Sequence, residues 1–105
     1  MISNGTVDEA RAAFGRQAWG AARAAYAALA DQALTLDDLE RCATAAHLVG
    51  NDAESRDALL RGYHEALARG DVTRAVRFAY WVGHSMIFTG ELAQASGWWA
   101  RARSL

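Results

Sequence analysis

Residues 89–99, with the sequence TGELAQASGWW, follow an apolar run over residues 78–88 and carry the pattern that decides the fold. Gly90 separates two segments of helical character, and the small residue Ala95 follows it by five positions. Trp99 comes one turn later and therefore lies on the same helical face as Ala95. The pattern predicts a close crossing of two helices at Ala95, with the Trp99 ring filling the space beside it.

The same arrangement occurs twice more in the chain. Ser55 follows Gly50 by five positions, and Ala22 has the equivalent place in the first segment. These small residues are 33 and 40 positions apart, close to the 34-residue period of some helix-turn-helix repeats. We therefore expect an all-α fold of three antiparallel helix pairs, over about residues 7–31, 36–69 and 72–103. Thr6 and Thr35 are the predicted N-caps of the first and third helices.

Composition agrees with a single helical domain over residues 1–105. The chain is 52% hydrophobic and 22% charged, and it contains no proline and 25 alanines, a bias toward helix. The only cysteine, Cys42, has no partner for a disulfide within the chain, which favours a reducing, cytoplasmic location. No apolar run is long enough for a membrane span. The helical pattern reaches Leu105 without a stop signal, so we expect a piece of a longer chain.

The pattern Gly-x-x-x-x-Ala-x-x-x-aromatic resembles the second half of a tetratricopeptide (TPR) repeat. Ser55 replaces the usual alanine, Leu59 replaces the aromatic residue, and the proline that often ends a repeat is absent, so the repeats are degenerate. The blocks GRQAWGAARAAYAAL, AAHLVGNDAES and FAYWVGHSMIFTGELAQASGWWARA are similar to the N-terminal helical-repeat segment of bacterial LuxR-type transcriptional regulators. The resemblance implies a regulatory TPR-like array that precedes a DNA-binding helix-turn-helix.

In a TPR array the first helix of each pair lines a concave face, and the resemblance implies that this face binds a protein or peptide. Carrying those positions onto this chain predicts a groove of mixed charge and aromatic character, which comprises Arg11, Glu40, Thr44, His47, Arg77, Tyr80 and His84. Such a surface suits a protein better than a nucleic acid, and the net charge of −1 gives no general attraction to nucleic acids or anionic membranes. The alternative hypothesis is a sensor that holds a small ligand in a closed apolar cavity beside Tyr80 and His84.

No pattern in the sequence predicts an enzyme, a metal site or a cofactor. Residues 83–87, GHSMI, begin like a nucleophile elbow, but the second glycine is missing and the segment has helical character. The three histidines lack the spacing that places two metal ligands on one helical face. The larger rings fall at helix-packing positions, so we expect a core role for Trp19, Tyr26, Trp81 and Trp99.

Trp98 is predicted to be an interface residue. Neighbours on a helix point about 100° apart, so Trp98 and Trp99 cannot both face the partner helix of their own pair. We expect Trp98 to face solvent, a following helix or another subunit. Because the last helix is apolar over much of its surface, we predict that it forms an interface with Trp98 at its centre. For this chain on its own, the predicted interface would join two copies in a homodimer.

Overall fold

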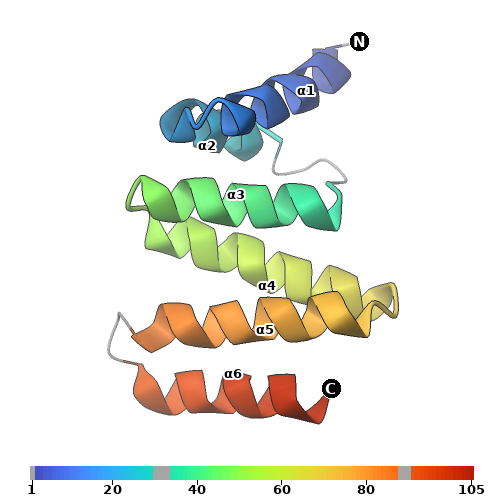
Figure 1. Ribbon diagram of the computed structural model, residues 1–105, viewed down its shortest axis with the longest axis vertical. Helices are drawn as coiled ribbons and strands as arrows, with labels where there is room; N and C mark the ends of the chain where they lie inside the picture. The colour runs from blue at the N-terminus through green and yellow to red at the C-terminus, as the bar shows by residue number, and fades with distance from the viewer. Residues whose placement is uncertain (1, 30–33, 88–90) are drawn as a thin grey trace. The chain divides into compact units, whose positions relative to one another are not determined.

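The computed structural model describes residues 2–29, 34–87 and 91–105, and in these ranges the chain forms helices and no strand (Figure 1). The all-α prediction is confirmed. The helices are α1 (Ile2–Gly15), α2 (Trp19–Ala27), α3 (Leu36–Leu48), α4 (Asp52–Ala68), α5 (Val72–Ile87) and α6 (Leu92–Ser104). The predicted turn at Gly90 and the predicted end of the second helix at Asp31 lie outside the described residues.

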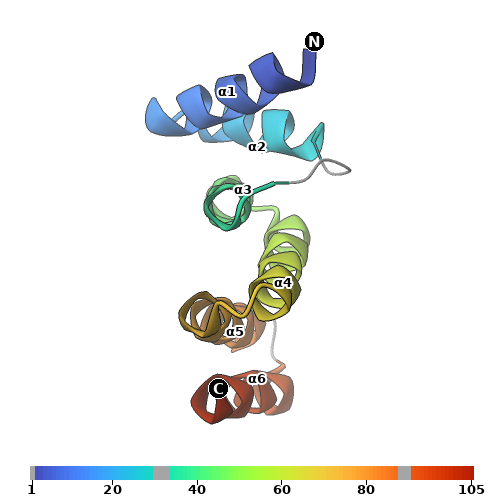
Figure 2. The same cartoon turned by 90° about the vertical axis from the view of Figure 1, so that its right-hand side faces the viewer.

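The chain divides into two compact units, residues 1–55 and 56–105, and the division falls in the first turn of α4. In the first unit, α2 packs against both α1 and α3. In the second unit, α5 lies beside α6, as Figures 1 and 2 both show, and residues of α4 contact both helices. A single domain over residues 1–105 stays a prediction.

Each helix pair has two buried small residues twelve positions apart: Ala10 with Ala22, Ala43 with Ser55, and Gly83 with Ala95. The Ser55 hydroxyl donates a hydrogen bond to the carbonyl oxygen of Ala43 at 2.8 Å, which satisfies its polar group at a place where the other pairs have alanine. A Cβ atom added to Gly83 would lie 3.0 Å from the carbonyl oxygen of Ala95 and 2.7 Å from Nε1 of Trp99. The close crossing predicted at Ala95 is therefore confirmed.

Glycines follow the ends of α3 and α4. Gly50 and Gly70 have φ values of 85° and 72°, in the left-handed region where glycine carries no Cβ penalty. After each glycine the backbone N–H of the next residue reaches back into the last helical turn, from Asn51 to Ala46 at 2.8 Å and from Asp71 to Ala66 at 2.9 Å. Both helices thus end in a Schellman-type cap.

The two predicted N-caps differ in outcome. Thr35 caps α3, where its hydroxyl accepts the backbone N–H of Asp38 at 3.0 Å. Thr6 lies inside α1, because that helix already begins at Ile2, so the prediction that Thr6 is an N-cap is wrong. No proline precedes Thr6 to stop the helix from extending toward the N-terminus.

We expect Ala95→Leu to destabilise the protein by about 1–3 kcal/mol. Ala95 is fully buried beside Gly83, so the added carbons have no space unless the two helices move apart. Ala93→Leu is the matched control, since Ala93 lies exposed on the same helix, and it should change the free energy of unfolding by less than about 0.5 kcal/mol. Urea unfolding of both variants makes the comparison, and equal stabilities would contradict the close crossing.

Candidate functional site

An open groove of about 700 Å³ lies between α5 and α6. Its lining is aromatic and aliphatic, with one arginine from each helix, and consists of Val76, Arg77, Tyr80, Trp81, Trp99, Ala102 and Arg103. The two most exposed rings are Tyr80 and Trp81, with 46% and 47% of their surfaces accessible. Large apolar rings that remain this accessible beside a groove are typical of a binding surface.

Contacts among the rings hold the groove in shape. Nε1 of Trp99 donates a hydrogen bond to the carbonyl oxygen of Tyr80 at 3.2 Å, which links α6 to α5. The rings of Tyr80 and Trp99 stack with centroids 6.3 Å apart, and Trp81 packs edge-on against Tyr80 at 5.3 Å. These rings have few rotatable bonds and are further restricted by one another, so little conformational entropy is lost when a partner covers them.

The second unit brings together three of the predicted groove residues. Arg77 and Tyr80 line the groove. His84 is outside the lining but adjoins it, with its ring 6.2 Å from that of Tyr80 and 5.1 Å from that of Trp81. A partner lying along the groove could therefore contact residues from Arg77 to His84.

The predicted residues of the first unit do not form a comparable groove. Glu40 and Thr44 line a smaller hollow of about 200 Å³, together with Phe14, Asp37 and Arg41. His47 is outside that lining, and its Nδ1 atom lies 3.2 Å from a carboxylate oxygen of Asp52 on the surface. Arg11 is directed instead at a carboxylate on α3.

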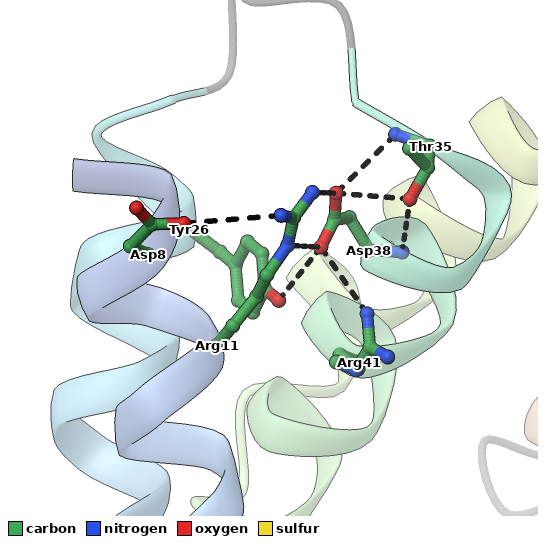
Figure 3. A network of polar contacts seen from close by, with 6 residues as sticks. All are labelled: Asp8, Arg11, Tyr26, Thr35, Asp38 and Arg41. Carbon is green, nitrogen blue, oxygen red and sulfur yellow. Dashed lines mark hydrogen bonds and ion pairs between the residues drawn. The ribbon is translucent and has the colours of Figure 1, made fainter. Parts of the chain in front are cut away.

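That carboxylate belongs to Asp38, which is 1% exposed and lies at the centre of a polar network (Figure 3). Arg11 donates to it through Nε at 3.0 Å and Nη2 at 2.8 Å. The hydroxyls of Tyr26 and Thr35 donate at 3.1 Å and 2.9 Å, and Arg41 donates at 3.3 Å. The network connects α1, α2 and the N-terminal turn of α3, so the geometry gives Arg11 a part in holding the first unit together.

The network also shifts the pKa values of its members. The hydrogen bonds from Arg11 are the main cause that holds the pKa of Asp38 far below its ordinary value, against the opposing effect of burial. Burial, followed by the negative charge of Asp38, raises the pKa of Tyr26 to about 12. At neutral pH the folded protein therefore contains an ionised Asp38 beside a neutral Tyr26 hydroxyl.

The core predictions for the larger rings have mixed outcomes. Tyr26 is 1% exposed and its core role is confirmed. Trp19 and Trp99 are only partly buried, and Trp81 is exposed on the groove, so the prediction of a core role for Trp81 is wrong. Helix α5 has more apolar residues than it buries, and Tyr80, Trp81 and Ile87 remain exposed. That excess is the signal in the sequence that could have located the groove.

Trp98 packs inside its own unit. Its ring lies edge-on against Tyr63 of α4, with centroids 5.0 Å apart, and the guanidinium of Arg101 stacks on it at 4.5 Å. The expectation that Trp98 faces solvent, a following helix or another subunit did not include this contact with the preceding helix α4, and its role as an interface residue stays a prediction. A homodimer through the last helix stays a prediction.

Over the parts of the chain that the structure describes, no group of three or more His, Cys, Asp or Glu side chains could hold a metal ion. The hydroxyl of Ser85, in the segment that begins like a nucleophile elbow, donates to the carbonyl oxygen of Val82 at 2.7 Å within α5. Of the helices described, none has both the length and the apolar composition needed to cross a bilayer.

Comparisons of the whole chain with protein-family models, with curated proteins and with solved structures found no match.

Proposed function

We propose that this chain is a TPR-like protein-interaction domain that binds a protein or peptide partner in the groove between α5 and α6. The observation that carries the proposal is the combination of accessible Tyr80 and Trp81 rings with Arg77 and Arg103 in one groove lining. Tryptophan, tyrosine and arginine are the residue types that contribute most often to binding hot spots between proteins.

The open form of the groove favours a macromolecular partner over the alternative, a small-ligand sensor. A sensor of that kind would enclose its ligand and bury most of the ligand's surface. The hollow beside Tyr80 instead opens to solvent along two helices, a form that accepts an extended or helical segment of another chain.

Affinity capture from a lysate of the source organism tests the proposal. A chain with both Arg77→Ala and Tyr80→Ala should lose a partner that the parent retains, because the two substitutions remove an aromatic contact and a charge from the groove. The matched control combines Arg69→Ala with Leu67→Ala, two exposed positions at the end of α4, and should retain the same partner. An unchanged set of captured proteins in the groove variant would contradict the proposal.

We extend the proposal to a bacterial, cytoplasmic regulator of the LuxR type. Support comes from the resemblance of the helical blocks to that class, and the single Cys42 suits a reducing compartment. In this extension the chain supplies the regulatory interaction, and DNA is bound by another part of the intact protein. A mobility-shift assay of the intact gene product with its own upstream DNA tests the extension, and the absence of any specific shift would contradict it.

A further inference from the structure

The three helix pairs have equivalent positions that can be compared through their small crossing residues. Four positions after Ala22, Ser55 and Ala95 come Tyr26, Leu59 and Trp99, and seven positions after them come Leu29, Gly62 and Ala102. On a helix, positions four and seven lie close to one face. The second helix of each pair therefore has an equivalent face. What covers that face can be compared across the three pairs.

In the first pair this face is covered by the helix that follows. Tyr26 and Leu29 are 1% and 2% exposed. The Tyr26 hydroxyl donates to Asp38 of α3 at 3.1 Å, and Ala45 of α3 joins the buried cluster that contains Ala22. The face of α2 is thus covered by α3, which contributes the Asp38 carboxylate and the small apolar residue Ala45.

On α4 the equivalent face is also covered by the following helix. Leu59 packs against the cluster that contains Val82 and Met86 of α5. A Cβ atom added to Gly62 would overlap the ring of Phe78, also on α5. A second α-helix therefore lies on this face, through apolar contacts.

On α6 the equivalent residues Trp99 and Ala102 line the open groove beside α5, and both are only partly buried. The charged side chains of the groove are all positive. Its lining contains Arg77 and Arg103 and no aspartate or glutamate. Two copies of this face would therefore repel each other, whereas an acidic segment would be attracted.

We propose that this face binds an amphipathic α-helix of a partner protein, with an apolar stripe on Tyr80, Trp81 and Trp99 and with carboxylates toward Arg77 and Arg103. The proposal rests on the proposed function and adds the conformation and charge of the partner. The partner's helix would cover this face of α6 as α3 covers the equivalent face of α2 and α5 covers that of α4.

The test uses the full chain and three synthetic peptides of about 18 residues, long enough to follow helices of 16 and 13 residues. The first peptide is a helix of leucine, alanine and glutamate, with leucines in one stripe and glutamates on both flanks. The second has glutamine for every glutamate. The third has the composition of the first but contains two prolines that prevent helix formation. Fluorescence anisotropy of the labelled peptides measures the dissociation constants.

We expect the acidic helix to bind at least about tenfold more tightly than either of the other peptides. Trp81→Ala should weaken its binding by about tenfold or more and Arg103→Gln by about threefold or more, because the first removes an aromatic contact and the second a charge. Leu67→Ala on α4 and Arg69→Gln just after it, two matched exposed changes, should leave it unchanged. Circular dichroism of each variant confirms that it is folded.

Three results would overturn the inference. The proline peptide could bind as tightly as the helix, which would leave protein binding in place and refute the helical partner. A single-stranded oligonucleotide could bind more tightly than the acidic helix and lose affinity with Trp81→Ala, which would assign the groove to nucleic acid. Sedimentation could show self-association that Trp81→Ala abolishes, which would make a second copy the occupant. If no peptide binds and the groove variant also captures the parent's partners, the proposed function fails as well.

Discussion

Replacing Arg11 with methionine is expected to destabilise the folded protein by about 3 kcal/mol. The substitution keeps an unbranched apolar side chain but removes the guanidinium that donates to Asp38 at 2.8 and 3.0 Å. The carboxylate is 1% exposed with the guanidinium in place, and the Arg11 side chain is itself 44% exposed, so water replaces only part of the lost hydrogen bonding. Asp38 retains donors from Tyr26, Thr35 and Arg41, which places the cost at the low end for a broken buried pair.

Asp8→Asn is the matched control, because Asp8 faces the same guanidinium from the solvent side. Its carboxylate lies 3.9 Å from Arg11 and is 78% exposed, so its loss should cost less than about 0.5 kcal/mol. Urea unfolding at pH 7 compares the two variants with the parent. A double variant with Arg11→Met and Asp38→Asn should be less destabilised than the sum of its single changes, because a neutral amide no longer needs the guanidinium. Additive costs would show that Arg11 and Asp38 act independently.

The Asp38 carboxylate also makes stability depend on pH in a direction that can be derived. Its folded pKa is depressed, chiefly by Arg11, from an ordinary value of 3.8. A group of this kind adds stability above its unfolded pKa and loses that contribution as the pH falls below it. Between about pH 5 and pH 2 the parent should therefore lose stability faster than Asp38→Asn, so that the two converge. A constant difference across this range would contradict the ionised state of Asp38.

The fold could be predicted from spacing because the constraints on helix pairs are local. A small residue at each crossing, a glycine after a helix and a threonine before one depend on neighbouring positions of the chain, and Ala95, Gly50 and Thr35 have those roles. The start of α1 could not be found in this way, since nothing in residues 2–6 excludes a helix.

The candidate site was harder to predict because it depends on what covers each helix. The sequence shows an apolar run over residues 78–88 but not which of its residues remain open, and only the structure shows that Trp81 is exposed while Phe78 is buried. Asp38 posed a similar problem. Two acids in the first turn of a capped helix usually lie in solvent, and the burial of Asp38 follows from Arg11 and Tyr26, distant in sequence.

Phe78→Ala should destabilise the protein by about 3–5 kcal/mol. The ring is 1% exposed, it is contacted by Gly62 of α4, and the guanidinium of Arg74 lies 5.9 Å from its centroid. Its removal leaves a cavity between two helices. Tyr80→Ala, on the same helix with a ring that is 46% exposed, should cost less than about 1 kcal/mol. Thermal and urea unfolding distinguish the two, and similar losses would mean that Phe78 is not a core residue.

The glycine opposite this ring allows a sharper test, because the effect of one substitution should change sign. In the parent, a Cβ atom on Gly62 would overlap the buried Phe78 ring. Gly62→Ala should therefore cost about 1–3 kcal/mol, although alanine is otherwise the better helix former by about 1 kcal/mol. In the Phe78→Ala background the ring is absent, so the same change should stabilise the protein by about 1 kcal/mol through helix propensity and partial filling of the cavity. A double-mutant cycle measured by urea unfolding gives both values. If Gly62→Ala has the same sign in both backgrounds, α4 and α5 do not meet at these residues, and the coverage of the α4 face by a following helix loses its support.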